Sequence, residues 1–278
     1  MPIYVYSRIL FHWGYSVRVP GTSGGGPSLP LPPPSTLVGS LAYWLSKRLG
    51  WREIMLATLG GGRRRAPAAV STAYRLARHL LAAGVAAVGE QFAVLYRDRV
   101  RYQITQYQSP ANLRDPMQWF ASINFGLTVA PNLALDVVLV LDDNVSEEGV
   151  DENLLEEAAW SQVRLGAREG IVSVLEASVG RAYESSGGQT LLYAPREAFE
   201  NCLGRLVFEA WDPRDPNGWA RGEKPPKPLE ICAPTVDSPS PDIYMLRKKR
   251  RPLTIRGDWP SYTGDWPLEL GPIAALAR

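Results

Sequence analysis

The segment Ser28–Lys47 (SLPLPPPSTLVGSLAYWLSK) sets three consecutive prolines directly before a helix-like apolar run. Residues that precede a proline avoid the α-helical region, so no helix can extend backwards through Pro34. Ser35 or Thr36 is then a suitable N-cap for a helix. The apolar side chains that follow fall on one helical stripe: Leu37, Leu41, Trp44, Leu45 and Leu49. The segment therefore predicts an amphipathic helix with an accurately fixed start.

Strand patterns stand on both sides of this helix. Ile3–Pro20 and Gln91–Tyr107 alternate in the manner of strands, and Leu133–Asp143 is continuously β-branched, which is typical of a strand buried on both faces. Glu169–Val179 predicts a further strand. Between Gln91–Tyr107 and Leu133–Asp143, the stretch Ser109–Gly126 is expected to form an irregular loop.

Two further helices are expected. Ser146–Gly166 has an acidic first turn and a glycine stop, with an apolar stripe made of Leu154, Leu155, Ala158 and Trp160. Ser71–Val88 is rich in alanine and leucine, so we expect a helix there as an insertion.

The resulting order is strand, helix, helical insertion, strand, strand, helix, strand. This is the βαββαβ pattern of the ferredoxin-like or RNA-recognition-motif (RRM) fold. We therefore predict an α+β chain with a ferredoxin-like domain over residues 1–182, carrying an insertion around residues 60–90. Residues 183–278 hold short strand-like runs among many prolines and glycines and predict a smaller β-rich C-terminal region.

Composition describes a globular protein with a real core, because 45% of the residues are hydrophobic and 21% are charged. No apolar run reaches 18 residues and no export signal stands at the N-terminus, so we expect a cytoplasmic protein without membrane contact. Cys202 and Cys232 lie far apart and are interpreted as free buried thiols. A disulfide becomes plausible if the source is a hyperthermophile.

Charge is unevenly distributed along the chain. Residues 1–140 hold 14 Lys and Arg against 5 Asp and Glu, whereas residues 141–278 hold 16 against 23. A basic half and an acidic half suggest a polyanion on one side and a protein partner on the other. Arginine accounts for 25 of the 30 basic residues, which suits phosphate binding but also follows from a GC-rich genome.

Candidate basic sites are Arg63, Arg64 and Arg65 on a glycine-flanked tip, and Arg97, Arg99 and Arg101 on one strand face. Both arrangements suit phosphate contacts, although a solvated surface would give the same pattern. The run Arg247–Arg251 could clamp RNA, contact a partner or form a plain surface loop. His12 and His79 have no neighbouring metal-ligand spacing, so we expect packed or surface histidines, no metal site and no cofactor.

Three segments in order resemble the archaeal, type I-A branch of the CRISPR-associated Cas5 family: FHWGYSV (11–17), LPLPPPSTLVGSLAYWL (29–45) and AAWSQVRLGAREGIVSV (158–174). The resemblance implies a RAMP-superfamily subunit with the RNA-recognition-type fold that the strand order predicts. Members of this family cap one end of the type I effector complex (Cascade) in antiviral defense. They hold the 5′ handle of the CRISPR RNA (crRNA) and contact the backbone (Cas7) and large (Cas8) subunits.

One branch of the family is a metal-independent endoribonuclease that cuts precursor CRISPR RNA. The resemblance places Tyr43 where that branch has a catalytic tyrosine, but the branch's Lys-His pair has no counterpart here. Tyrosine alone is a poor general base near neutral pH, so we expect a non-catalytic binding subunit, with Tyr43 as a packing or RNA-contact residue. The nuclease, with Tyr43 and His12 as its candidate residues, is the alternative. A structural adaptor that meets RNA only inside the complex is a third reading.

The turn after the second expected helix completes the predicted RNA-binding set. Arg164, Gly166, Arg168 and Glu169 form this turn, where glycine permits the close approach of a backbone. Glu169 has a second interpretation, in which it only orients Arg168 or caps the turn.

Overall fold

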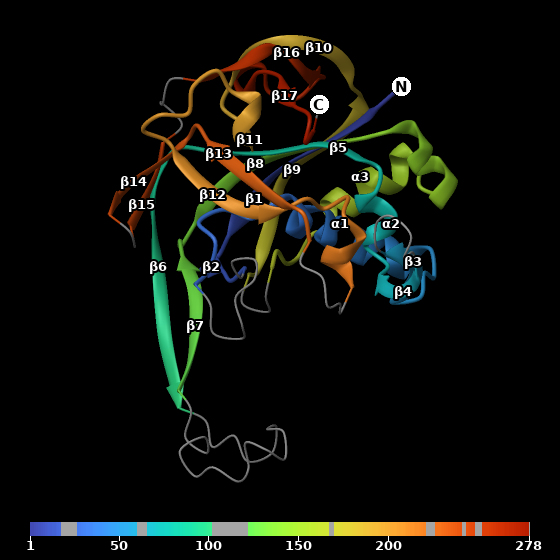
Figure 1. Ribbon diagram of the computed structural model, residues 1–278, viewed down its shortest axis with the longest axis horizontal. Coiled ribbons are helices and arrows are strands. Elements are labelled where there is room, and N and C mark those ends of the chain that lie inside the picture. Colours follow the sequence, from blue (N-terminus) through green and yellow to red (C-terminus); the bar gives the residue numbers. More distant parts are fainter. Residues whose placement is uncertain are drawn as a thin grey trace.

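The computed structural model describes residues 1–17, 27–59, 66–101, 122–166, 170–220, 226–240, 243–247 and 252–277. It is a mixed α/β structure, rich in strands and with few helices (Figure 1). The predicted sites Arg63, Arg64, Arg65, Arg168 and Glu169 lie outside the described residues, as do residues 248–251 of the basic run.

Four strands form a central antiparallel sheet in the order β5-β8-β1-β9. Their bounds are β1 (Ile3–Phe11), β5 (Leu80–Ala87), β8 (Leu133–Leu141) and β9 (Val172–Arg181). Strand β1 lies between β8 and β9, so Ile3 stands opposite both Leu141 and Arg181. The strands that the sequence predicts near the positions of β1, β8 and β9 are confirmed.

Helix α1 (Pro34–Arg48) follows β1 in the chain and buries Leu37, Leu41 and Leu45, as the stripe predicts. Its N-cap is Pro33 and no side chain caps it, so the expectation of Ser35 or Thr36 as N-cap is wrong. Proline is well suited to the first helical position, since its fixed φ matches the helix and its missing N–H would have no partner there.

Helix α3 (Glu152–Trp160) follows β8 and contacts α1, β1 and β9. Its N-cap is Asp151, whose carboxylate accepts a hydrogen bond of 2.8 Å from the Leu154 amide. Leu155 and Ala158 are buried, but Trp160 is 49% exposed. Trp160 therefore does not belong to the buried stripe in which the sequence placed it.

The expected helix over Ser71–Val88 is wrong. It contains only the four-residue α2 (Tyr74–Ala77), and β5 follows. A Cβ at Gly84 would lie 2.9 Å from the Leu192 Cβ, so the C-terminal part of the chain packs closely on β5. Small residues are needed for that contact, and this packing overrides the helical propensity of alanine.

Two antiparallel strand pairs lie outside the central sheet. One is the hairpin of β3 (Ile54–Leu59) and β4 (Ala66–Ser71). The other is the long pair of β6 (Glu90–Arg101) and β7 (Ser122–Val129), which projects away from the body of the protein (Figure 1). Since β7 covers Ser122–Gly126, the loop expected there is wrong over these residues. The rest of the predicted loop, 109–121, lies outside the described residues.

The long pair belongs to a five-stranded sheet in the order β14-β15-β6-β7-β2. The added strands are β2 (Gly14–Tyr15), β14 (Val236–Ser240) and β15 (Ile243–Arg247). Strands from both ends of the chain therefore support the projecting pair.

The rest of the C-terminal third is strand-rich, as the sequence predicts. One sheet has the order β10-β16-β17 and another β11-β13-β12. The strands are β10 (Tyr183–Thr190), β11 (Ala194–Pro195), β12 (Leu206–Trp211), β13 (Pro228–Ala233), β16 (Leu253–Thr263) and β17 (Ile273–Ala274). Short 3-10 turns complete the described elements: η4 (Asp143–Glu148), η5 (Arg196–Ala198), η6 (Pro216–Trp219) and η7 (Leu268–Leu270).

Cys202 and Cys232 form a disulfide, with their Cα atoms 6.5 Å apart. The interpretation as free thiols is therefore wrong, although both side chains do pack with the cluster of Phe199, Ile255 and Trp259. A separation of 30 residues in the sequence carries no sign of this proximity.

The domain boundary near residue 182 stays a prediction.

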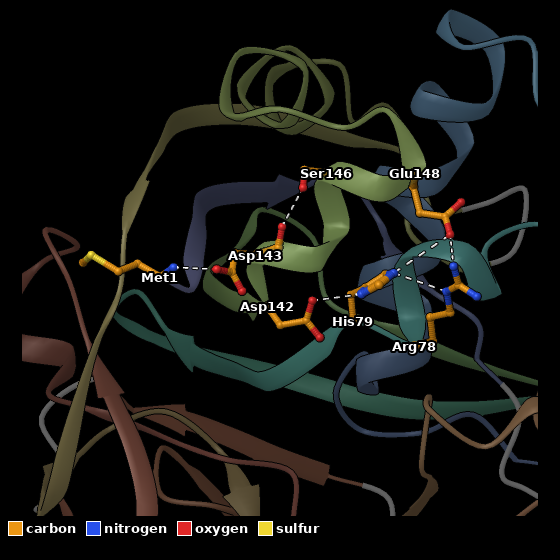
Figure 2. A network of polar contacts seen from close by, with 7 residues as sticks. All are labelled: Met1, Arg78, His79, Asp142, Asp143, Ser146 and Glu148. Atoms are coloured by element: carbon orange, nitrogen blue, oxygen red, sulfur yellow. Dashed lines mark hydrogen bonds and ion pairs between the residues drawn. The ribbon is translucent and has the colours of Figure 1, made fainter.

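A polar network fixes α2 and the start of β5 to η4 (Figure 2). The Glu148 carboxylate is buried and accepts hydrogen bonds from Arg78 and, at 2.7 Å, from Arg75. His79 Nδ1 lies 2.9 Å from an Asp142 oxygen, so this histidine is a packed one. The network holds the insertion in place and lies apart from the groove described below.

Candidate nucleic-acid interface

A groove of about 580 Å³ opens between α1 and the turn that joins α3 to β9. We call it the Tyr43 groove. Its lining residues come from two parts of the chain that are about 120 positions apart: Thr36, Gly39, Ser40 and Tyr43, then Ser161, Val163, Arg164, Gly166 and Ile171. Three of the predicted site residues, Tyr43, Arg164 and Gly166, are thereby brought together.

Helix α1 supplies a polar wall. Positions 36, 39, 40 and 43 have the i, i+3, i+4, i+7 spacing of one helix face. Tyr43 is 55% exposed, and Lys47 Nζ lies 5.8 Å from the centroid of its ring. The packing role considered for Tyr43 is therefore wrong. Its ring is available to a ligand.

Gly39 leaves space open in this wall. A Cβ built on Gly39 would meet no heavy atom within 4 Å. Glycine inside a helix costs about 1 kcal/mol relative to alanine, and no packing partner explains it here. What the glycine does provide is an accessible stretch of helix backbone beside Ser40 and Tyr43.

The opposite wall is the turn after α3. Leu165 is fully buried and its amide donates to the Gly170 carbonyl at 2.8 Å, which anchors the turn. Arg164 beside it is exposed, and no carboxylate of the described residues forms an ion pair with it. The guanidinium can therefore bind an anion in the groove without breaking a native pair.

The backbone geometry at position 166 requires a glycine. Its φ of +80° is left-handed, and a Cβ would lie 2.9 Å from the Ser16 carbonyl oxygen. Close approach to Ser16 connects the groove to the projecting β6–β7 pair, because Ser16 Oγ donates a 2.6 Å hydrogen bond to the Gly126 carbonyl on β7. Gly126 in turn stands opposite Arg97.

The predicted basic residues Arg97, Arg99 and Arg101 occupy alternate positions of β6, opposite Gly126, Asn124 and Ser122. Alternate positions of a strand share one face, as the sequence predicts for these three. The described backbone thus leads from the Tyr43 groove through Ser16 to the base of an arginine-bearing strand.

His12 lies beside the groove and does not line it. Its backbone amide donates to the carbonyl of Ile171, a lining residue, at 3.2 Å. Its ring Nε2 lies 2.8 Å from Ser173 Oγ. His12 is thus oriented by β9, next to the wall that holds Arg164.

Sequence patterns alone did not identify Gly39, Ser40, Val163 or Ile171 as lining residues. Their only local signal is the spacing of small and polar residues along α1, which becomes a wall once α3 is placed. Within the described ranges, no group of three or more His, Cys, Asp or Glu could hold a metal ion, and no helix is long and apolar enough to cross a membrane.

Comparison with known proteins gives consistent relatives, although no family model matches the chain. A protein of Saccharolobus solfataricus described as CRISPR system aCascade subunit Cas5 1 is 31% identical over 206 residues, which cover 73% of this chain and 77% of the relative. CRISPR-associated protein Cas5 3 of the same organism is 28% identical over 237 residues, covering 84% and 90%.

The fold is similar to that of a solved structure. A crystal structure of a CRISPR protein from Archaeoglobus fulgidus superimposes with a TM-score of 0.57 and 17% identity, and the match covers 100% of both chains. At this identity the likeness concerns the fold alone.

Proposed function

The chain belongs to the Cas5 family of CRISPR-associated proteins, and from that premise we propose that it is a non-catalytic RNA-binding subunit of a type I effector (Cascade) complex. Its ligand is the 5′ handle of the CRISPR RNA. One observation carries the proposal: the Tyr43 groove combines a guanidinium that no described carboxylate pairs, an exposed aromatic ring and an open helix backbone.

These groups match the chemistry of single-stranded RNA. Arg164 can bind a phosphate, the Tyr43 ring can stack on a base, and the Thr36 hydroxyl can bond to ribose or base edges. Ser40 Oγ directs its proton to the Leu37 carbonyl or to Gln162 Oε1 and can still accept a hydrogen bond. Arg97, Arg99 and Arg101, on the strand that the backbone connects to the groove through Ser16, stay predictions as further phosphate contacts. Arg63, Arg64, Arg65, Arg168 and Glu169 stay predictions as contacts to the same RNA.

The central sheet supports the ferredoxin-like, RRM-type reading of residues 1–182. In chain order the strands of this sheet are β1, β5, β8 and β9. Helix α1 follows the first of them and α3 the third, which is the βαββαβ connection with the insertions removed. We propose the Cas7 backbone and Cas8 large subunits as protein partners and the cytoplasm as the location.

Binding to labelled repeat RNA tests the proposal. We expect the purified protein to bind the handle sequence with an affinity that falls steeply as salt rises, because phosphate contacts release counterions. Replacing Arg164 by Ala should weaken binding, and Arg196→Ala on η5 is the matched control for loss of an exposed arginine. Equal affinity of the two variants for the handle would contradict the role of the groove. Binding seen only in the assembled complex would favour the adaptor reading.

The exposure of Tyr43, with His12 beside the same wall, keeps the endoribonuclease as a second candidate. Incubation of repeat RNA with the protein in EDTA separates the two functions. The binding subunit leaves the RNA intact. Specific cuts that Tyr43→Phe abolishes would establish the nuclease instead.

A further inference from the structure

A second groove lies next to the first, on the other side of Ser161. It also measures about 580 Å³ and is lined by Trp44 of α1 and by Asn153, Glu156, Glu157 and Trp160 of α3, with Ser161 shared between the two grooves. We call it the Trp160 groove. Apart from Ser161, none of these residues lines the Tyr43 groove.

Two tryptophans give this groove an unusual surface. Trp44 is partly buried against the main core, whereas Trp160 at the end of α3 leaves 49% of its surface exposed. An indole ring is large and rigid and is enriched where proteins meet partners.

The charge of the groove is negative. No described residue forms an ion pair with Glu156, and Glu157 has only Arg48 at 4.0 Å, with both side chains more than half exposed. Such an exposed, distant pair contributes little. Glu152 on the same helix is already engaged by Arg181 at 2.6 Å, outside the groove. Among the described residues, the α3 carboxylates without a close ion pair, Glu156 and Glu157, are thus those that line the groove with the tryptophans.

Carboxylates beside indole faces select cations and repel phosphates. A guanidinium can lie over an indole face and bind a carboxylate through its N–H groups at the same time. A nucleic-acid backbone would instead meet two like charges. The acidic and aromatic chemistry of the groove complements a basic protein segment.

We propose that the Trp160 groove is the docking site for an arginine-bearing segment of a protein partner in the effector complex. The proposal rests on the proposed membership of such a complex, and it is independent of RNA binding by the Tyr43 groove. A single turn at Ser161 then separates the RNA from the protein partner.

Photo-crosslinking in the assembled complex tests this directly. Trp160→p-benzoylphenylalanine places a reactive ketone in the groove, and we expect it to crosslink to a protein subunit at a peptide that contains arginine. A crosslink to the RNA or to a second copy of this chain would overturn the proposal, as would the absence of any crosslink from a complex that still assembles. The same group at Leu268, which is 93% exposed on η7, is the control position.

Affinity for the crosslinked subunit provides the second measurement. Trp160→Ala should weaken binding about tenfold, whereas Trp160→Phe, which keeps an aromatic face, should retain most of it. Circular dichroism melting checks that both variants are folded, and handle-RNA affinity should not change in either. Equal partner affinity for Trp160→Ala and the unchanged protein would overturn the proposal. Unchanged RNA binding in Arg164→Ala would count against the proposed function alone, whereas a missing crosslink at Trp160 would count against this inference alone.

Discussion

The Tyr43 groove and the Trp160 groove share Ser161 and have similar volumes, yet they present opposite charges. Both are built from α1, in the basic half of the chain, and from the end of α3, in the acidic half. Arg164 itself belongs to the acidic half. Local placement of a few side chains therefore decides which ligand each groove suits, and the charge balance of the half-chains does not.

The largest effect is expected from Arg164→Ala. Loss of a charge-assisted contact to phosphate should weaken handle binding by roughly tenfold to a hundredfold at moderate salt, since such bonds contribute about 1.5–3 kcal/mol. The dependence of affinity on salt should also become less steep. Filter binding over a salt series measures both quantities. If the variant also lost its protein partner, the two grooves would not be independent.

Charge reversal in the Trp160 groove should weaken binding of the protein partner and not binding of RNA. Glu156→Lys should weaken partner binding about tenfold through like-charge repulsion, and should leave the affinity for RNA unchanged or slightly higher. Glu147→Lys is the matched control, since Glu147 is exposed on η4 outside both grooves. Titration of the partner subunit by calorimetry measures the difference. Equal losses in the two variants would assign the effect to net charge alone.

Gly166→Ala tests the turn that shapes the Tyr43 groove. The alanine would have to adopt a left-handed φ, and its added Cβ would lie against the Ser16 carbonyl. We therefore expect the substitution to lower the free energy of unfolding by about 1–3 kcal/mol. Urea unfolding measures this loss. Gly50→Ala is a useful control, because Gly50 has a φ of +65° but open space around its Cβ, and should cost less. A similar loss in both would show that the contact with Ser16 adds nothing.

Gly39 should respond in the opposite direction to Gly166. Gly39→Ala should stabilise the fold by about 0.5–1 kcal/mol, because it removes a helix-interior glycine and meets open space. Gly39→Gln should keep part of that gain and weaken RNA binding several-fold by filling the groove. Thermal melting and RNA titration check the pair. Full RNA affinity in Gly39→Gln would place the ligand elsewhere.

The sequence predicted the elements whose local patterns agree with their tertiary surroundings. The stripe of Leu37, Leu41 and Leu45 and the β-branched run of β8 are of this kind. β5 is the opposite case. A Cβ on its Gly84 would lie 2.9 Å from the Leu192 Cβ and 3.2 Å from Ile273 Cδ1, and both residues lie more than a hundred positions away in the sequence. The β7 strand was missed because the segment before it carries prolines and breaks the pattern.

Of the candidate site, the sequence supplied Tyr43, Arg164 and Gly166 but not their proximity. Gly39 and Ile171 carry no chemical signal of their own and become lining residues only when α1 and the turn after α3 face each other. Trp160 illustrates the remaining difficulty. An apolar residue at helical spacing predicts burial, and only the three-dimensional structure shows that this one faces solvent.

Because Ser161 forms part of both grooves, the order in which ligands arrive becomes a thermodynamic question. Suppose that RNA, on binding, shifts this turn and changes the affinity for the protein partner by some factor. Linkage then requires the bound partner to change the affinity for RNA by the same factor. A guide-first and a protein-first assembly route would end at one free energy and differ only in which intermediate accumulates.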